Sequence, residues 1–254
     1  MAESTDTDAL RQQWEALAPD WIQKVGDSGD AARQLLDPFM IQSCRTLVGG
    51  DLAGKRVVDI GCGEGRFTRR LAGEGATVDG IDPCTPLLDH ARRLADSAQQ
   101  FHEASAEALP FEQARFDLAV FYLSTCDMPD LAAALREAHR VLRPGGGCAL
   151  CTIHPMADSP GGSRGWVRDY RGRKIVRTID DYFDEGPFDC PLSPTHSVTN
   201  FRLTIQSHLD ACLDAGFTLK RLIEPKPTAD QLREHPGLDD EARVPSFILF
   251  QLTR

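Results

Sequence analysis

The chain has 254 residues, 41% hydrophobic and 26% charged, which is typical of a globular protein with one α/β domain and an insertion, or with two small domains. Its formal net charge of −10 argues against a nucleic-acid partner, because such proteins usually present a basic patch to phosphate groups. No apolar run approaches the roughly 20 residues of a membrane-spanning helix, and the polar start MAESTDTDALRQQW lacks a signal-peptide core, so we expect a cytoplasmic protein without a membrane partner.

Strands and helices are expected to alternate through the first 153 residues. Two helical stretches come first, at residues 8–25 and 30–48, each interrupted by a proline. Strands are then expected at residues 56–60, 77–81, 100–103, 116–123 and 148–153, and helices at 64–72, 86–98 and 130–142. This alternation predicts a parallel, doubly wound sheet with right-handed crossovers. The apolar strands AVFYL and CALCTI indicate a sheet covered on both faces.

Residues 155–195 differ from the rest, because they are rich in Gly, Pro, Asp and Arg and carry few periodic apolar positions. A segment of this length is usually functional, for example a lid, or partly disordered. GWVRDY and KIVRTI suggest a β-hairpin within it. A helix is expected again at residues 201–215, followed by strands at 217–223 and 247–252.

Eight cysteines invite a disulfide or zinc interpretation, but their positions argue against both. Cys148 and Cys151 form a C-x-x-C inside an expected buried strand, and no second such pair is present. We therefore expect no metal site, and cysteines that serve as small core residues in a reducing compartment.

A turn of three glycines follows the first strand: Gly61, Gly63 and Gly65 in VVDIGCGEGRF. In an open α/β sheet, ligands bind beyond the carboxyl ends of the strands, and glycine lets the backbone approach such a ligand closely. The helix that follows points free N–H groups at the same place, which favours a negative group such as a carboxylate. The dinucleotide spacing G-x-G-x-x-G is not met, because Arg66 occupies the third position.

Asp82 ends the second expected strand, 21 residues after Gly61. A carboxylate at this point can accept two hydrogen bonds from a ribose diol. The alternative is an ordinary loop aspartate in an Asp-Pro turn.

The motifs VVDIGCGEG, GIDP, SAEALPF, FDLAVF and HRVLRPGGG occur in this order over about residues 55–154. As a set they resemble the class I S-adenosylmethionine-dependent methyltransferases that act on small molecules. The resemblance implies a Rossmann-like sheet of seven strands with the last antiparallel, and S-adenosylmethionine (SAM) as cofactor.

The resemblance also implies a role for individual residues. The methionine part of SAM would be surrounded by Asp59, Gly61, Cys62, Gly63, Tyr122 and Leu123. Asp82 would hold the ribose hydroxyls, with Pro83 beside the adenine, and the adenine edge would meet Ser105 and Ala106. Ser105 departs from the aspartate common in such sequences, and its uncharged hydroxyl is a weaker acceptor.

The resemblance leads us to expect a single methyltransferase domain over residues 1–254. Its parts are an N-terminal helical cap (1–50), a SAM-binding core (51–154), a substrate-side insertion (155–198) and a C-terminal completion of the sheet (199–254). The N-terminal helices and the insertion are expected to form a cap over the site.

Candidates for acceptor chemistry lie outside the glycine turn. His154 follows the fifth strand and can titrate near neutral pH as a base must, or it is a loop histidine bonded to backbone. His196 either closes over the site or helps to start the later helix. Tyr182 lines the substrate pocket or anchors the insertion. Trp14 and Trp21, seven residues apart, share a helix face that packs internally or covers the cofactor.

These features together predict transfer of a methyl group from SAM to a small-molecule acceptor, a hydroxyl or an amine, by in-line displacement in a water-excluded pocket. One alternative is a non-catalytic protein that retains the SAM pocket. A second is an NAD(P)-dependent reductase, which shares the fold but not the glycine spacing. No feature of the chain marks the acceptor molecule or the oligomeric state.

Overall fold

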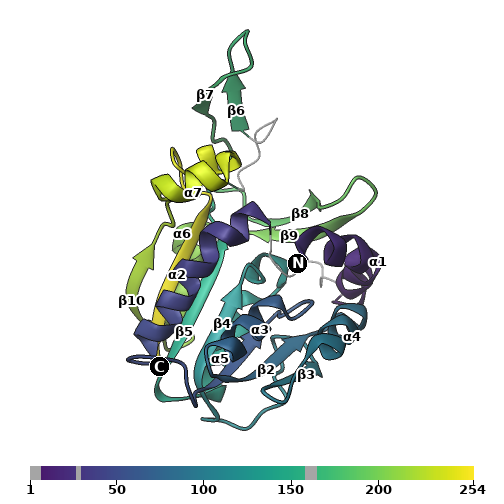
Figure 1. The fold of residues 1–254 in the computed structure, drawn as a ribbon, viewed down its shortest axis with the longest axis vertical. Coiled ribbons are helices and arrows are strands. Elements are labelled where there is room, and N and C mark those ends of the chain that lie inside the picture. The colour runs from purple at the N-terminus through teal and green to yellow at the C-terminus, as the bar shows by residue number, and fades with distance from the viewer. Residues whose placement is uncertain (1–6, 27–29, 158–164) are drawn as a thin grey trace.

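A computed structural model describes residues 7–26, 30–157 and 165–254. Its centre is a sheet of seven strands in the order β10-β11-β5-β4-β1-β2-β3 (Figure 1). The strands are β1 (Arg56–Ile60), β2 (Thr77–Asp82), β3 (Gln99–Glu103), β4 (Phe116–Tyr122), β5 (Leu142–Ile153), β10 (Thr218–Ile223) and β11 (Phe247–Thr253). β11 runs antiparallel to both of its neighbours, and the remaining pairings are parallel. The predicted seven-stranded, Rossmann-like α/β sheet with an antiparallel last strand is confirmed.

The strand order reverses at β1, which pairs with β2 on one side and with β4 on the other. The carboxyl ends of these three parallel strands therefore meet at one edge of the sheet. In open α/β sheets this reversal leaves a crevice between the flanking connections, and ligands bind there.

Alternate residues of the strands are buried against helices on opposite faces of the sheet. Val58 and Ile60 of β1 pack in one cluster with residues of α5 (Leu131–Val141) and α6 (Ile205–Asp214). Val57 packs in a second cluster with residues of α2 (Ala31–Leu47) and α3 (Arg66–Gly73). The predicted covering of both faces is therefore observed, and Cys148 and Cys151 of β5 are fully buried between them.

Two helices pass through the prolines that were expected to interrupt them. α1 (Thr7–Val25) contains Pro19, and α2 contains Pro38. A proline inside a helix removes one hydrogen bond and costs about 3 kcal/mol. α2 tolerates this cost because Leu35, Leu36 and Met40 are completely buried against the sheet, so tertiary packing overrides local propensity.

Other element boundaries differ from the expectation for local reasons. α3 begins at Arg66 rather than residue 64, because Gly65 has a left-handed backbone (φ +76°) that a helix cannot contain. α4 (Thr85–Leu94) ends four residues early. β5 begins at Leu142, so residues 143–147, between the expected helix and strand, belong to the strand, and Gly147 pairs with Leu118 of β4 and Thr253 of β11.

The segment after β5 forms two hairpins in its described part. β6 (Trp166–Arg168) pairs with β7 (Lys174–Arg177), as predicted, and this hairpin projects from the body of the molecule (Figure 1). β8 (Gly186–Pro191) pairs with β9 (Ser197–Arg202), which was not predicted and which occupies the start of the helix expected at 201–215. Residues 158–164 of the expected insertion, and residues 1–6 and 27–29 of the expected N-terminal cap, lie outside the described residues.

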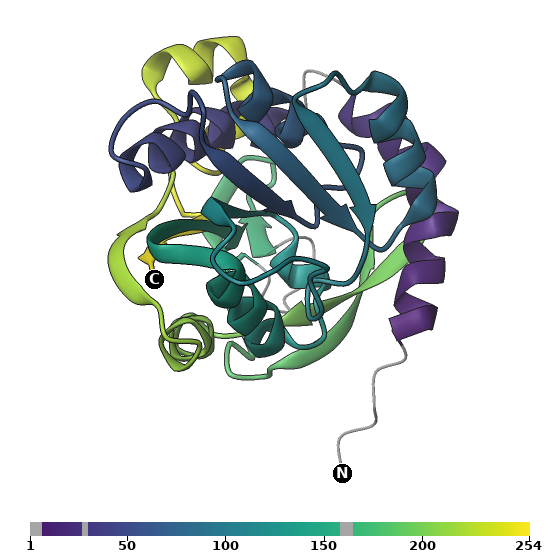
Figure 2. The same ribbon diagram turned by 90° about the horizontal axis from the view of Figure 1, so that it is seen from below.

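α1 and the β8–β9 hairpin lie together beside the carboxyl edge of the sheet. α1 packs on α4 through Ala18 and Leu87 (Figure 2). On its other side the amide of Gln13 bonds to β9, accepting from the Thr199 N–H at 2.8 Å and donating to the Thr199 hydroxyl at 3.2 Å. These contacts place an N-terminal helix and a late hairpin over the same part of the fold.

Two short helical segments lie between β10 and β11, in a region where no helix was predicted. They are α7 (Ala229–Glu234) and a 3₁₀ turn (Pro236–Asp239). None of the helices in the described part of the chain has the length and apolar character needed to cross a bilayer.

Candidate active site

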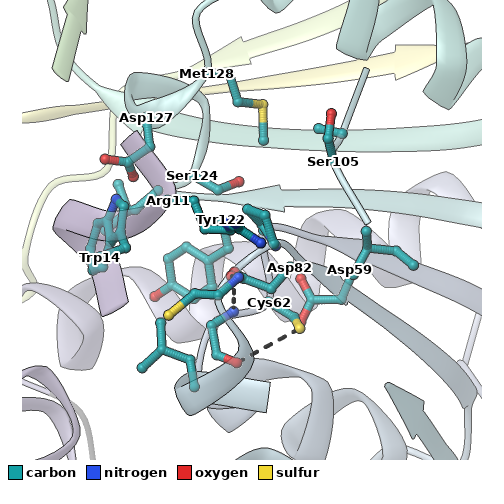
Figure 3. Close-up of a pocket in the computed structure, with 18 of the residues that line it drawn as sticks. Arg11, Trp14, Asp59, Cys62, Asp82, Ser105, Tyr122, Ser124, Asp127 and Met128 are labelled. Carbon is teal, nitrogen blue, oxygen red and sulfur yellow. Dashed lines mark hydrogen bonds between the residues drawn. The ribbon is translucent and has the colours of Figure 1, made fainter. Parts of the chain in front are cut away.

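A pocket opens over the carboxyl ends of β1, β2 and β4, beneath α1 (Figure 3). Its open space is about 1170 Å³, including the solvent at its mouth. Its walls come from α1, the glycine turn, the end of β2, the loop after β3 and the turn after β4.

The three glycines of the turn have left-handed backbones but serve different purposes. A Cβ on Gly61 would lie 2.4 Å from the Ser124 Cβ, and one on Gly65 would lie 2.8 Å from the Ala91 Cβ. A Cβ on Gly63 would meet only Leu87, at 4.0 Å. Gly61 and Gly65 therefore permit close packing within the protein, while Gly63 leaves open space on the pocket side.

Asp82 lies at the end of β2 and is tied to the glycine turn. One carboxylate oxygen accepts the Gly63 N–H at 2.9 Å, and the other accepts the Cys84 N–H at 2.9 Å. Burial raises the pKa of Asp82 to about 6, although both hydrogen bonds oppose this shift. A carboxylate has about four acceptor positions, so Asp82 can still accept bonds from a diol in the pocket.

Asp59, on β1, brings a second buried carboxylate to the pocket. The Thr68 hydroxyl donates to it at 2.6 Å. Burial raises the pKa of Asp59 to about 7, the Thr68 bond opposes this, and the nearby carboxylates of Glu64 and Asp82 raise it further. This concentration of carboxylates favours a cationic group in the bound ligand.

A buried ion pair supports the wall beside the turn. Arg66 makes two parallel bonds to Asp37, at 2.8 and 2.9 Å, and the Tyr122 hydroxyl donates to the same carboxylate at 2.8 Å. The Tyr122 ring also packs edge-on against Phe67, with ring centroids 4.6 Å apart. These contacts fix the aromatic face that Tyr122 presents at the end of β4.

Comparison with known proteins adds to this geometry. A family model described as a methyltransferase domain matches residues 58–150. The chain is 30% identical to an S-adenosylmethionine-dependent methyltransferase from Mesorhizobium loti, whose crystal structure it matches with a TM-score of 0.75 over 90% of this chain and 100% of that one. The chain belongs to the class I SAM-dependent methyltransferases.

Two curated relatives within this family match over a shorter region. One is the malonyl-[acyl-carrier protein] O-methyltransferase of Pseudescherichia vulneris, 40% identical over 41% of this chain and 41% of its own length. The other is the ubiquinone biosynthesis O-methyltransferase of Aromatoleum aromaticum, 39% identical over 41% of this chain and 46% of its own length. The chain thus spans less than half the length of the curated relatives it matches.

The pocket fits the cofactor of this methyltransferase family, which is SAM. Gly63 leaves room for close backbone approach, Asp82 offers acceptors for a ribose diol, and the surrounding carboxylates suit a sulfonium cation. The structure brings the sequence-predicted cofactor residues together, since all of them line this pocket. They are Asp59, Gly61, Cys62, Gly63, Asp82, Pro83, Ser105, Ala106 and Tyr122.

Ser105 is already engaged within its own loop. Its hydroxyl donates to the Glu107 carboxylate and accepts the Glu107 N–H at 3.2 Å. Glu107 also lines the pocket, so the methyltransferase has a carboxylate near the expected adenine edge although Ser105 itself is uncharged. No periodic pattern in the sequence marks this pairing, because the two residues lie in a loop and not in a helix or strand.

Trp14 and Trp21 of α1 both line the pocket, as their shared helix face suggested. Their rings meet edge to face, with centroids 5.3 Å apart, and the Trp21 indole donates to the Glu64 carboxylate at 3.3 Å. Because Glu64 lies between Gly63 and Gly65, this bond joins α1 to the glycine turn.

The two histidines considered as bases do not line the pocket. His154 is buried, and its Nδ1 accepts the Met156 N–H at 3.1 Å while its Nε2 lies 3.3 Å from a Glu224 oxygen. Burial lowers its pKa below the usual value, although Glu224 opposes this. His196 lies in the β8–β9 turn, with its Nδ1 3.3 Å from an Asp20 oxygen. A catalytic role for either residue stays a prediction without a pocket contact in its favour.

Tyr182 also lies away from the pocket lining. Its hydroxyl accepts the Ile205 N–H at 3.1 Å, at the start of α6. This contact supports the alternative in which Tyr182 anchors the insertion, and not the one in which it lines the substrate pocket.

Sequence reasoning missed several residues that the structure brings to the site. Arg66 was noted only as an obstacle to dinucleotide binding, and its buried partner Asp37 was not considered. Asp127, in the turn after β4, lines the pocket beside Ser124. Its position shortly after an apolar strand, at the edge where ligands bind, was the available signal.

Proposed function

We propose that this methyltransferase transfers the methyl group of SAM to a small-molecule acceptor, an oxygen or nitrogen nucleophile. The observation that carries the proposal is the carboxylate of Asp82, which is anchored to Gly63 and lies in a pocket that α1 covers. The curated relatives support oxygen as an acceptor atom, since both are O-methyltransferases. Their similarity to this chain is confined to part of each protein, so it supports the reaction class rather than a particular acceptor.

SAM supplies a methyl group that is already activated as part of a sulfonium. The protein must therefore align donor and acceptor and exclude water. Holding reactants in line can contribute roughly 7–11 kcal/mol of the barrier reduction in favourable cases. Asp82 and Gly63 fix one end of the cofactor, and the indoles of Trp14 and Trp21 cover the pocket from the side of α1.

The charge of the protein and the cover over the pocket support a small acceptor. The chain carries a net charge of −10, so a polyanion such as RNA or DNA would be repelled. α1, which Gln13 joins to Thr199 of β9, covers the pocket and favours a small acceptor over a macromolecular one.

The test is calorimetric titration of the protein with SAM, S-adenosylhomocysteine (SAH) and NADPH. We expect both adenosyl ligands to bind and Asp82→Ala to weaken them by about 1.5–3 kcal/mol, the loss of hydrogen bonds to a charged group. Asp214→Ala, which removes an exposed carboxylate at the end of α6, should leave both affinities unchanged.

Methyl transfer is then measured with radiolabelled SAM and a panel of phenols, amines and carboxylic acids. Binding of NADPH in place of the adenosyl ligands would contradict the proposal. SAH binding without transfer to any member of the panel would favour the alternative of a SAM-binding protein without catalysis.

A further inference from the structure

Asp127 is a pocket carboxylate that none of the cofactor motifs includes. It ends the 3₁₀ turn Thr125–Asp127, directly after β4. The pocket runs across the sheet edge from β2, where Asp82 lies, over β1 to β4. In the close-up, Asp127 lies beside Trp14, across the pocket from Ser105 (Figure 3). If the ribose lies at Asp82 and the adenine near Ser105, the reacting end of the cofactor points toward β4 and Asp127.

The carboxylate of Asp127 is held from two elements, β9 and α1. The Asn200 side-chain amide, on β9, donates to its Oδ1 at 2.5 Å. Asn200 is only 2% exposed, so its amide is not available to solvent. The indole of Trp14, on α1, also stabilises the charged carboxylate. Such bonds fix the orientation of a carboxylate and leave it capacity for a further donor.

The surroundings also suit proton transfer near neutral pH. Burial raises the pKa of Asp127 to about 7, with the bond from Asn200 opposing the shift and the charge of Asp82 adding to it. A base whose pKa lies near the working pH combines adequate ionisation with sufficient basicity. The Cys126 thiol lies 3.8 Å from Oδ2 and is a weak hydrogen-bond donor. The hydroxyl or amine of a methyl acceptor can take its place as the donor to Oδ2.

We propose that Asp127 is the catalytic base that meets the acceptor, and that Asn200 is its positioning residue. This proposal rests on the proposed methyl transfer. The acceptor is then a nucleophile that still carries a proton, a hydroxyl or an amine. A bond forms between its oxygen or nitrogen and the methyl carbon, the bond from that carbon to sulfur breaks, and sulfur keeps the electron pair. The proton of the nucleophile passes to Asp127, which becomes a neutral carboxylic acid.

The experiment compares SAH with sinefungin, in which a carbon bearing a protonated amine replaces the sulfur and its methyl group. That amine lies where the methyl group of SAM would be, next to the acceptor nucleophile, so a carboxylate that faces the nucleophile should attract it. In Asp127→Asn we expect sinefungin affinity to fall roughly 10- to 140-fold, as for the loss of a hydrogen bond to a charged group, while SAH affinity is unchanged. Asp210→Asn, the same change at an exposed site on α6, should leave both affinities unchanged.

The outcomes separate this proposal from the one on which it rests. If SAH does not bind the wild-type protein, the proposed function fails. If SAH binds but the ratio of sinefungin to SAH affinity is the same in Asp127→Asn and wild type, methyl transfer stands and the role of Asp127 is refuted. Asn200→Ala provides a second variant that keeps the carboxylate: a smaller fall in the ratio supports the positioning role, and no fall overturns it.

Two fragments distinguish the acceptor classes. The SAH-loaded protein is titrated with phenol, a hydroxyl donor, and with benzylamine, a cationic amine. A fragment whose affinity falls in Asp127→Asn supports the proposal and identifies the class. Unchanged affinity for both fragments overturns it.

Discussion

Replacing Gly61 by alanine should destabilise the fold through two separate effects. Gly61 has φ +74°, and an L-residue with a side chain pays about 1–2 kcal/mol in this left-handed region. Its new Cβ would also lie 2.4 Å from the Ser124 Cβ and 2.8 Å from the Ser124 hydroxyl oxygen. That hydroxyl donates to the Ile60 carbonyl at 2.7 Å, so Ser124 cannot move without breaking a buried hydrogen bond.

Overpacking of this kind typically costs about 1–3 kcal/mol. Added to the cost of about 1–2 kcal/mol for the left-handed backbone, this means that Gly61→Ala should lower the free energy of unfolding by about 2–5 kcal/mol. For a chain of this size about 2–4 °C of Tm is lost per kcal/mol, which predicts a fall of about 4–20 °C.

Gly63→Ala is the matched control, because its φ of +55° carries the same backbone cost while the new Cβ would meet only Leu87, at 4.0 Å. It should lose only about 1–2 kcal/mol. Both variants are compared by urea unfolding and by calorimetry with SAH, where Gly63→Ala should weaken binding because its Cβ occupies the pocket side. Equal stability of the two variants would refute the assignment of Gly61 to packing and Gly63 to the ligand.

Two further predictions concern buried charges. Burial raises the pKa of Asp59 to about 7, well above its unfolded value of 3.8. Between pH 3.8 and pH 7 the folded protein therefore binds more protons than the unfolded chain, so its free energy of unfolding falls as pH rises. The difference in Tm between ligand-free Asp59→Asn and wild type should therefore move in favour of the variant from pH 5 to pH 8. A difference that stays constant over this range would contradict the raised pKa of Asp59. Asp37→Ala leaves Arg66, 3% exposed, without its two parallel bonds and should cost about 3–5 kcal/mol in urea unfolding. Arg233→Ala, at an exposed pair, should cost less than about 1 kcal/mol, and a similar loss in both variants would argue against burial as the cause.

The residues expected to bind the cofactor line one pocket, and the sequence could indicate them because their signals are local. The glycines of the turn lie within five residues, and Asp82 ends a strand whose pattern is clear. Backbone geometry requires glycine at Gly65, and this requirement is visible in the sequence as a residue type at a fixed spacing.

The contact between Asp127 and Asn200, which we propose faces the acceptor, could not be predicted in the same way, because it joins distant segments. Asn200 meets Asp127 across 73 positions of the chain, and no periodic pattern marks either residue. The histidines were chosen for their chemistry and their place after an expected element, but the fold directs His154 to Glu224 instead of the pocket. The passage of α2 through Pro38 likewise depends on burial that only the tertiary structure reveals.

The hairpin β8–β9 gives the molecule a modular construction. Its Asn200 contacts Asp127 and its Thr199 contacts α1, yet within the described residues its strands pair only with each other and add no strand to the seven-stranded sheet. The hairpin can therefore vary between members of the family without altering the register of the strands that carry the cofactor residues. Under the role proposed for Asn200, residues 186–202 are the unit to exchange when a new acceptor is wanted on an unchanged SAM-binding core.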